Sequence, residues 1–307
     1  MRVAIVLDAG LVPGWSETWV KLCQSNSVEF KTFDSYDHDF IDRLVEYNPD
    51  RTLWRSAQRP VYKFKDEIQR QVLDKSNLQI VPNWRTHWLY DHKIRQSYLF
   101  KLFDIPHPKT TIFFDEDMAL KFVKTAQYPF VVKSDGGAGS KSFRFVERKR
   151  YARQLVERAF HREGKWTGRE YENNILYAQE YIKTPFVWRI AVFKDKAAFG
   201  YKAMNKPGTL TASGQGIREY PDVPSELFNM ARGINRQFKW DWCMYDIVWS
   251  EKHEKYLVLE ITDTCGAHGS AGRKDTYYRQ GRRWVPREEN ISPQEIVFNL
   301  FVLEDIQ

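Results

Sequence analysis

The chain reads YPFVVKSDGGAGSKSFRFV from Tyr128 to Val146, and this segment carries the clearest signal of its architecture. A short apolar strand pattern ends at Lys133, a glycine-rich segment follows, and a second strand pattern begins at Phe143. The order predicts a β-hairpin whose loop places consecutive backbone N–H groups beside a lysine. Such amides form a concave anion site, and glycine lets the backbone approach a phosphate closely. We therefore predict phosphate binding by Lys133 and the loop at Gly136–Ser140.

The glycine cluster has two other interpretations. A P-loop needs glycine directly before its lysine and a helix after it. Here Ser140 precedes Lys141 and a strand pattern follows, which excludes a P-loop. An ordinary flexible hairpin turn explains the glycine cluster, taken alone, equally well.

Length and composition limit the class of protein. A chain of 307 residues exceeds the usual size of a single core, so we expect more than one domain. It has no run of about 18 apolar residues, and Asp8 interrupts the N-terminal apolar run too early for a signal peptide. We therefore expect a cytoplasmic protein with no membrane association. Its three cysteines are far apart and lack CxxC spacing, which argues against disulfides and a zinc site.

The formal charge of +7 and the isoelectric point near 9.1 indicate an anionic partner. Nucleotide phosphates, acidic peptides and nucleic acid would all satisfy this charge. Charge alone therefore does not choose among them.

Strand and helix patterns alternate through the first part of the chain. Strands are predicted at 2–7, 28–33, 52–55 and 78–81, and helices at 15–23, 40–47 and 63–73. This alternation predicts a small open sheet with helices, which we assign to a domain at residues 1–91. An amphipathic helix is predicted at 91–103, with Ile94, Tyr98, Leu99 and Leu102 on one face.

A polar segment without periodicity, residues 161–174, divides the remaining chain. Before it we predict a strand within 105–114, helices at 116–125 and 150–161, and the glycine hairpin between these helices. After it the chain is rich in strands, at 175–182, 187–193, 197–205, 243–249 and 256–262, with helices at 225–238 and 293–303. We therefore predict a central subdomain at 92–168 and a C-terminal subdomain at 169–307.

Two carboxylates lie near the ends of neighbouring strand patterns, Asp246 in MYDIVW and Glu260 in LVLEIT. The intervening SEKHEK segment reads as a hairpin turn, so antiparallel pairing would place both carboxylates on one face of the sheet. Mg²⁺ takes oxygen ligands, usually one or two carboxylates together with substrate phosphates. The alternative is a pair of solvated side chains at strand ends.

Several features follow one another in a defined order along the chain. They are Lys93 at a helix start, Lys133 before the glycine loop, the strand end QEYI at 179–182, Arg189, Asp246, and Glu260 followed by TDTCGAHGS. In this order the chain resembles the ATP-grasp superfamily, specifically the carboxylate–amine ligases similar to glutathione synthetase and the ribosomal-protein glutamate ligase. The resemblance covers almost the whole chain. LWRS, IVPN and the DHK segment at 91–93 are similar to signatures of that family's preceding domain.

The resemblance implies an α+β or α/β architecture, an ATP-grasp fold with a Rossmann-like preATP-grasp domain at its N-terminus. It implies ATP and Mg²⁺, or Mn²⁺ in its place, as cofactors. The implied contacts to ATP are Lys93, Lys133, Gly136, Gly137, Gly139 and Ser140 at the phosphates, and Glu180, Tyr181 and Ile182 at adenine. The implied catalytic residues are Arg189 and Lys202, which would face an acyl phosphate. The implied metal ligands are Asp246, Glu260 and Thr262, and the implied substrate contacts are Arg55 and Ser213. Arg282 and Arg283, in the basic segment described below, are further candidate substrate contacts.

One position departs from the family pattern. The family commonly has Asn two residues after the metal-binding Glu, whereas this chain has Thr262 followed by Asp263. A threonine hydroxyl can still ligate Mg²⁺, and Asp263 could substitute after a small shift, so one metal site is expected to be weaker or differently built. Cys265 and His268 could form a nucleophilic pair, but we expect them to line the loop after Glu260.

The segment from Gly272 to Arg287 interleaves six basic residues with three aromatic ones. This mixture can hold a nucleic-acid backbone and stack on bases, or bind the carboxylates of an acidic peptide. A solvated loop with a few packed aromatic side chains is the alternative.

Three functions remain open on the sequence alone. The first is an ATP-dependent ligase that joins a carboxylate, such as that of an amino acid or peptide, to an amine through an acyl phosphate. The second is a protein that keeps the fold but only binds nucleic acid or an acidic macromolecule, and the third is an ATP-dependent kinase. We favour the ligase, because Lys133, Asp246 and Glu260 are all present. The oligomeric state is open, and a homo-oligomer is compatible with the sequence.

Overall fold

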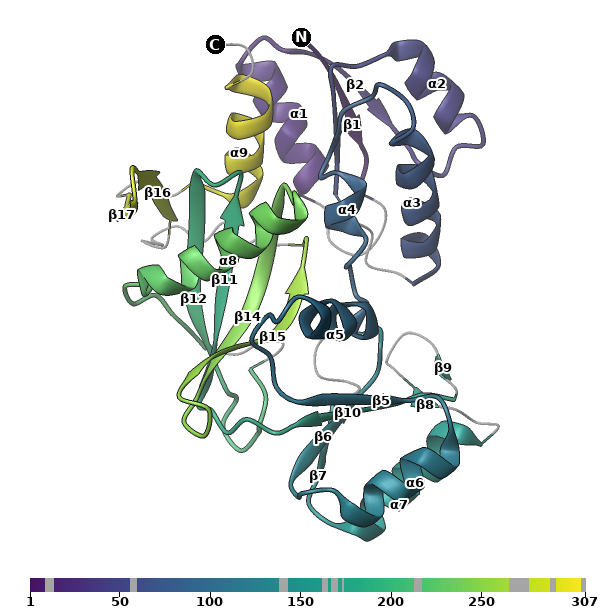
Figure 1. The fold of residues 1–307 in the computed structure, drawn as a ribbon. Helices are drawn as coiled ribbons and strands as arrows, with labels where there is room; N and C mark the ends of the chain where they lie inside the picture. The colour runs from purple at the N-terminus through teal and green to yellow at the C-terminus, as the bar shows by residue number, and fades with distance from the viewer. Residues whose placement is uncertain are drawn as a thin grey trace.

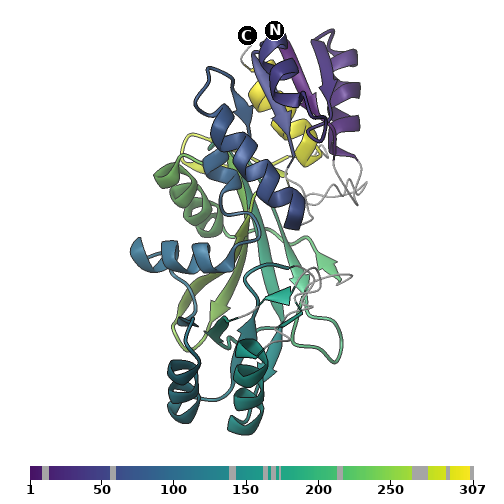
Figure 2. The same cartoon turned by 90° about the vertical axis from the view of Figure 1, so that its right-hand side faces the viewer.

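The computed structural model describes residues 1–8, 14–55, 60–137, 143–161, 165–166, 171–172, 174–212, 217–264, 276–287 and 291–304. The N-terminal domain lies at one end of the molecule, the central subdomain lies at the other, and the largest sheet lies between them (Figure 1). Strand β1, near the start of the chain, and helix α9, near its end, lie at the same end of the molecule in both views (Figures 1 and 2). Among the described helices, none is both long enough and apolar enough to cross a lipid bilayer.

The N-terminal sheet is parallel, with strand order β2-β1-β3-β4. Its strands are β1 Arg2–Val6, β2 Glu29–Phe33, β3 Arg51–Trp54 and β4 Ile80–Val81. The connecting helices are α1 Trp15–Ser25, α2 Phe40–Tyr47 and α3 Pro60–Leu73. Parallel neighbours need crossover connections, and the alternating strand and helix patterns of the sequence supply them. The predicted small open sheet is confirmed.

Two helices, α4 Trp84–His87 and α5 Lys93–Leu102, lead into the central subdomain. Its sheet has the order β5-β10-β6-β7, and α6 Glu116–Thr125 and α7 Lys149–Phe160 pack against it. The strands are β5 Thr110–Phe113, β6 Phe130–Lys133, β7 Arg144–Val146 and β10 Leu176–Glu180. The predicted hairpin is confirmed, because β6 and β7 pair antiparallel. A short separate pair, β8 Lys165–Trp166 and β9 Tyr171–Glu172, precedes β10.

The predicted boundary at residue 168 is wrong. Strand β10 lies antiparallel between β5 and β6, so residues 176–180 belong to the central sheet. The sequence does not reveal this, because a strand that follows a polar segment can join either of the sheets beside it.

The large sheet has the order β15-β14-β11-β12-β16-β17, and β13 pairs with β12. Its strands are β11 Phe186–Phe193, β12 Ala197–Met204, β13 Arg218–Glu219, β14 Trp242–Ser250, β15 Lys255–Thr262, β16 Thr276–Gln280 and β17 Arg283–Pro286. Helix α8 Ser225–Phe238 covers one face. The described part of the basic segment, residues 276–287, forms the hairpin β16–β17, in which Tyr277 and Trp284 are buried against α8.

The other face of the large sheet shares a hydrophobic core with the N-terminal domain. The C-terminal helix α9 Pro293–Phe298, continued by a π-helical turn at Asn299–Leu303, lies beside α1 (Figure 1). Trp242 of β14 stacks on Trp15 of α1 at 6.5 Å between ring centroids and contacts Phe301 at 5.8 Å. One core therefore joins the two ends of the chain.

We predict that replacing Trp242 with Ala lowers the free energy of unfolding by about 3–5 kcal/mol, because it opens a cavity in this shared core. Urea denaturation followed by circular dichroism measures the change. Trp249, an exposed tryptophan on the same strand, is the matched control, and Trp249→Ala should cost about 1 kcal/mol or less. Equal losses in the two variants would contradict a shared core centred on Trp242.

Candidate functional site

Strand register brings three charged side chains onto one face of the large sheet. Arg189 of β11 lies opposite Asp246 of β14, and Asp246 lies opposite Glu260 of β15. Arg189 Nε is 3.3 Å from Asp246 Oδ1. Burial raises the pKa of Asp246 more than Arg189 lowers it, so the site favours a further cation near this carboxylate. The predicted antiparallel pairing of Asp246 and Glu260 is confirmed.

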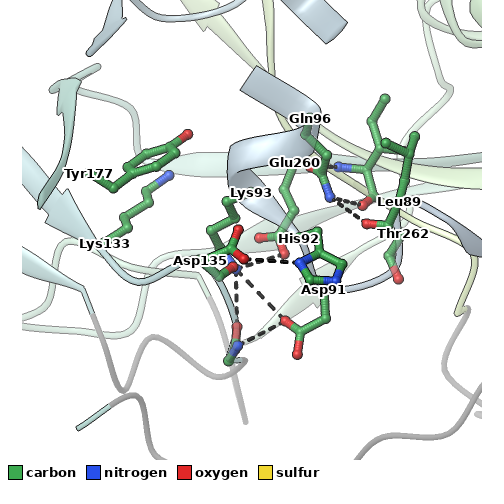
Figure 3. A network of polar contacts seen from close by, with 12 residues as sticks. Leu89, Asp91, His92, Lys93, Gln96, Lys133, Asp135, Tyr177, Glu260 and Thr262 are labelled. Carbon is green, nitrogen blue, oxygen red and sulfur yellow. Dashed lines mark hydrogen bonds and ion pairs between the residues drawn. The ribbon is translucent and has the colours of Figure 1, made fainter. Parts of the chain in front are cut away.

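Lys133 reaches the same region from the central sheet. Its Nζ donates to Gln179 Oε1 at 2.7 Å, and the Gln179 amide donates to Thr110 Oγ1 at 2.9 Å and the Tyr177 hydroxyl at 3.2 Å. Figure 3 shows the Lys133 side chain beside Tyr177. Burial lowers the pKa of Lys133 to about 8, and the nearby Lys93 charge acts in the same direction, against Glu260 and Asp246. This lysine therefore lies where an additional anion would be stabilising.

Lys93, at the start of α5, joins the two subdomains (Figure 3). Its side chain is only 8% exposed. The ammonium donates to Gly137 O at 3.1 Å and lies 3.3 Å from Glu260 Oε1 and 3.9 Å from Asp91 Oδ1. Burial alone would lower the pKa of Lys93, but Glu260 and Asp91 outweigh it and raise the pKa. Lys93 is therefore held as a cation.

Two aspartates fix the start of the glycine-rich loop against α5. Asp135 accepts from the backbone N–H of Ile94 at 2.8 Å and lies 2.9 Å from His92 Nδ1. Asp91 accepts from the N–H of Gly137 at 2.9 Å. Gly137 has φ of +106°, a backbone conformation that favours glycine. The loop thus begins from a fixed point beside Lys93.

These side chains converge on one cleft between the central and C-terminal subdomains. Its polar lining includes Lys93, Lys133, Gln179, Arg189, Asp246 and Glu260. The segment connecting β10 to β11 adds Glu180, Tyr181 and Ile182, and its apolar wall includes Val131, Phe143, Val187, Leu210 and Leu259. Cationic and anionic groups therefore lie at one part of a cleft that also has an apolar wall.

The Glu180 carboxylate contacts two residues that do not line the cleft. It accepts from Lys252 Nζ at 2.5 Å and lies 2.9 Å from His253 Nε2, both in the β14–β15 turn. Burial would raise the pKa of Glu180, but these two partners outweigh it and lower the pKa. The carboxylate thus links the connecting segment to the large sheet, and the backbone of 180–182 remains to contact a ligand.

The sequence predicts that Lys202 and Arg189 both face an acyl phosphate, but Lys202 does not lie beside Arg189. Arg189 pairs with Tyr201, whereas Lys202 pairs with Trp188, so Lys202 is on the opposite face of the sheet. Its Nζ lies 4.2 Å from the centroid of the Phe186 ring. Alternation along β12 is the physical reason for the correction.

Asp263 is not positioned to replace an absent metal ligand. It is buried, with Oδ2 at 3.2 Å from His87 Nδ1, and its carbonyl accepts from Trp242 Nε1 at 2.7 Å. Thr262 Oγ1 lies 2.9 Å from Thr264 Oγ1, and Thr262 is not among the residues that line the cleft. The end of β15 is therefore tied to α4 and the core.

Other predicted residues lie away from the cleft lining or outside the description. Gly136, Arg55, Arg282 and Arg283 do not line the cleft. Arg282 and Arg283 are exposed at the β16–β17 turn, and the β12–β16 register directs this turn past Ala197, away from Arg189. Five residues that the sequence singled out lie outside the described residues, namely Gly139, Ser140, Ser213, Cys265 and His268.

The donor atoms fit a hard divalent cation. Asp246 and Glu260 present carboxylate oxygens from opposing positions on one face, which suits Mg²⁺ when a phosphate supplies further oxygens. Among the residues that the structure describes, no group of three or more His, Cys, Asp and Glu side chains could hold a metal alone. The site therefore needs a ligand to complete it.

Sequence reasoning missed several residues that organise the site. Asp91, Asp135 and Gln96 bind backbone groups, and Gln96 satisfies both the N–H and the carbonyl of Ile261 on the edge strand β15 (2.9 and 2.7 Å). The hydrophobic pattern placed Tyr98 and Leu102 on the buried face of α5, but they are 51% and 75% exposed. Gln179 is a polar residue in the largely apolar strand LYAQE, and this pattern could have indicated that its side chain has a partner in the site.

Comparison with known proteins finds similarity in sequence and in fold. No protein-family model matches the chain. It is 24% identical over 259 residues, 81% of this chain and 89% of the relative, to the alpha-aminoadipate–LysW ligase LysX of Saccharolobus solfataricus.

Solved structures have similar folds at low sequence identity. A RimK domain ATP-grasp protein from Sphaerobacter thermophilus has a TM-score of 0.56 and 16% identity, covering 85% of this chain and 90% of that one. The ATP-grasp ligase PsnB, solved with a minimal precursor, Mg and ADP, has a TM-score of 0.60 and 14% identity, covering 88% and 92%. These likenesses show the fold of this chain.

We predict that Lys93→Met lowers the free energy of unfolding by about 3–5 kcal/mol, because it leaves the Glu260 and Asp91 carboxylates without their buried counter-ion. Lys101, exposed on the same helix, is the control, and Lys101→Met should leave stability within about 0.5 kcal/mol of the parent protein. Chemical denaturation of both variants measures the difference. If Lys93→Met is as stable as the control, the ammonium does not hold the two subdomains together.

Proposed function

We propose that this chain, which has the ATP-grasp fold predicted from its sequence, is an ATP-dependent carboxylate–amine ligase that forms an amide bond and releases ADP and phosphate. The observation that carries the proposal is the convergence of Lys133, Asp246 and Glu260 on one cleft that also contains the 180–182 segment. A triphosphate needs cations and metal-binding carboxylates at one end and an apolar, hydrogen-bonding wall at the other. This cleft offers both.

Lys93 and Lys133 would contact the phosphates, because both ammonium groups face the cleft and are surrounded by oxygen acceptors that a phosphate can extend. The glycine-rich loop, entered through Gly136 and Gly137, would add backbone N–H groups. Backbone atoms of Glu180, Tyr181 and Ile182 would receive adenine, since the Glu180 carboxylate is already bound by Lys252 and His253.

Asp246 and Glu260 would hold Mg²⁺, with Thr262 as a further candidate only if its side chain moves toward them. When bound, the ion neutralises phosphate charge as it accumulates. Arg189 lies on the same face as both carboxylates, where it would stabilise negative charge on a transferring phosphoryl group.

The proposed reaction has two steps. An oxygen of the substrate carboxylate attacks the γ-phosphorus, the bond between that phosphorus and the β–γ bridging oxygen breaks, and ADP leaves. The amine nitrogen then attacks the acyl carbon and forms the amide bond. The bond between the acyl carbon and the phosphate oxygen breaks, and inorganic phosphate and a proton leave. Confining both substrates beside the anhydride favours the amine over water.

The acid and amine are proposed to be amino acids or peptides. LysX is named for joining alpha-aminoadipate to LysW, and PsnB was solved with a precursor peptide. These substrates belong to those proteins, and they support only the chemical class here.

Glu260→Gln should lower turnover at least a hundredfold, because an amide cannot neutralise the metal charge. The circular dichroism spectrum of this variant should be unchanged. Glu251→Gln, in the exposed turn of the same hairpin, should retain full activity. ADP release is measured against pools of amino acids and peptides, and mass spectrometry of the products identifies a new amide. A stable phosphorylated product would instead identify a kinase, and ATP binding without ADP release from any pool would identify a binding protein.

ATP affinity should depend on pH through Lys133. Because the pKa of Lys133 is lowered to about 8, the ammonium is present below that pH and is lost above it. The dissociation constant should therefore be flat from pH 6.5 to 7.5 and rise toward tenfold per pH unit above about 8.5. Lys133→Arg should flatten the profile.

Calorimetry in buffers of different ionisation enthalpy checks the same point. ATP binding at pH 8.5 should take up a proton in the parent protein and not in Lys133→Arg. Adenosine, which lacks phosphates, is the control ligand. An affinity that stays constant up to pH 9.5 in the parent protein would contradict a phosphate contact by Lys133.

A further inference from the structure

The face of the large sheet that carries Asp246 and Glu260 extends past Arg189 to strand β13. Tyr201 of β12 lies directly opposite Arg189. Two residues further along β12, Ala203 lies between Val187, which lines the cleft, and Arg218 of β13. Opposed residues of antiparallel strands share a face, and so do residues two apart in one strand, so Arg218 lies on the same face as Arg189, about 12 Å away between Cα atoms.

The Arg218 side chain lies over the tyrosine that is paired with Arg189. Its guanidinium carbon is 5.3 Å from the centroid of the Tyr201 ring. Tyr201 is only 6% exposed, and its ring packs against that of Tyr220 at 5.8 Å between centroids. A cation–π contact supplies no oxygen acceptor, so the N–H donors of Arg218 can still bind a carboxylate. The buried ring therefore supports the guanidinium without neutralising its charge.

The charge of Arg218 has no carboxylate partner among the described residues. None of their carboxylates forms an ion pair with it. The neighbouring Glu219 lies opposite Lys202, so it is on the other face of the sheet. Asp246 is paired with Arg189, at 3.3 Å between Oδ1 and Nε. Because Arg218 is half-buried, it is partly removed from water, and an anion beside it would be stabilising.

The two arginines differ in their position relative to the carboxylates proposed to hold Mg²⁺. Arg189 is directly opposite Asp246, whereas strand β12 separates Arg218 from β11 and β14. In the proposed reaction the attacking carboxylate approaches the γ-phosphorus beside Asp246 and Glu260. A substrate group that reaches Arg218 is therefore a different group from the one that reacts.

We propose that Arg218 binds a substrate carboxylate that does not react, and that it thereby selects substrates with such a carboxylate. The proposal rests on the ligase function proposed above, and it adds a residue that the sequence did not single out. This carboxylate can belong to the acid or to the amine substrate, because both lie beside the acyl phosphate when the amide forms. A charge-assisted hydrogen bond to Arg218 distinguishes a carboxylate from its amide.

Calorimetry on the full chain tests the proposal with two probes, glutarate for the acid and glycylglycine for the amine. Each is compared with its amide, glutaramate or glycylglycinamide. One of the two probes should bind the parent protein about tenfold more tightly than its amide, and that probe identifies the source of the carboxylate. Arg218→Gln should weaken binding of this probe about tenfold and change binding of the amide less than about twofold.

Two further variants separate recognition of the carboxylate from a general effect on the fold. Arg218→Lys keeps the charge and should bind the probe within about threefold of the parent protein. Arg236, an exposed arginine of α8, is the matched control, and Arg236→Gln should change affinity less than about twofold.

The proposal is overturned if the parent protein binds neither probe more tightly than its amide, or if Arg218→Gln and Arg236→Gln weaken binding equally. Neither measurement depends on ATP turnover. ADP release without selective binding of either probe would leave the ligase proposal standing and remove Arg218 from the site. Selective binding that is lost in Arg218→Gln, without ADP release from any pool, would retain the carboxylate site and overturn the ligase.

Discussion

A buried ammonium needs oxygen acceptors around it, and Lys93 meets this need by drawing together segments that are far apart in the chain. Asp91 lies beside it in the linker, Gly137 in the glycine-rich loop and Glu260 on the large sheet. An unpaired buried charge is very unfavourable. Moving one of these segments away would leave the buried Lys93 ammonium without an acceptor, so the three segments are held together. The cleft between the subdomains is thus set by the same charge that would contact a phosphate in it.

Alternation along the strands then decides which side chains can take part. On β11 and β14, Arg189 and Asp246 face the cleft, while Trp188 and Tyr245 are buried toward α8. Lys202 belongs to the second set by register, and it lies over an aromatic ring instead of the site. Charge and sequence distance do not distinguish Arg189 from Lys202, but a single step along a strand does.

The large sheet connects the functional regions of the molecule. At one end of the face opposite α8 lies the cleft with Asp246 and Glu260, and at the other end of that face Trp242 joins the core shared with α1 and the C-terminal helix. A second cavity, lined by residues of β4, α4 and the segment before β14, lies beside this second end. The Glu180 contacts to Lys252 and His253 attach the segment that connects β10 to β11 to this sheet.

Local pattern was enough to locate the helices other than the short α4, the β6–β7 hairpin and the Asp246–Glu260 pair, because apolar periodicity, turn residues and short connections act between near neighbours in the chain. It was not enough to place β10, to choose the buried face of α5, or to find Asp91, Asp135 and Gln96. Asp91 and Gln96 are buried and Asp135 is partly buried, because backbone groups of distant segments need their side chains as hydrogen-bond partners. The sequence by itself determined the order of the charged and polar residues along the chain. Only the tertiary structure decided that these residues share one cleft, and that a second cavity forms, because long-range contacts fix which segments face each other.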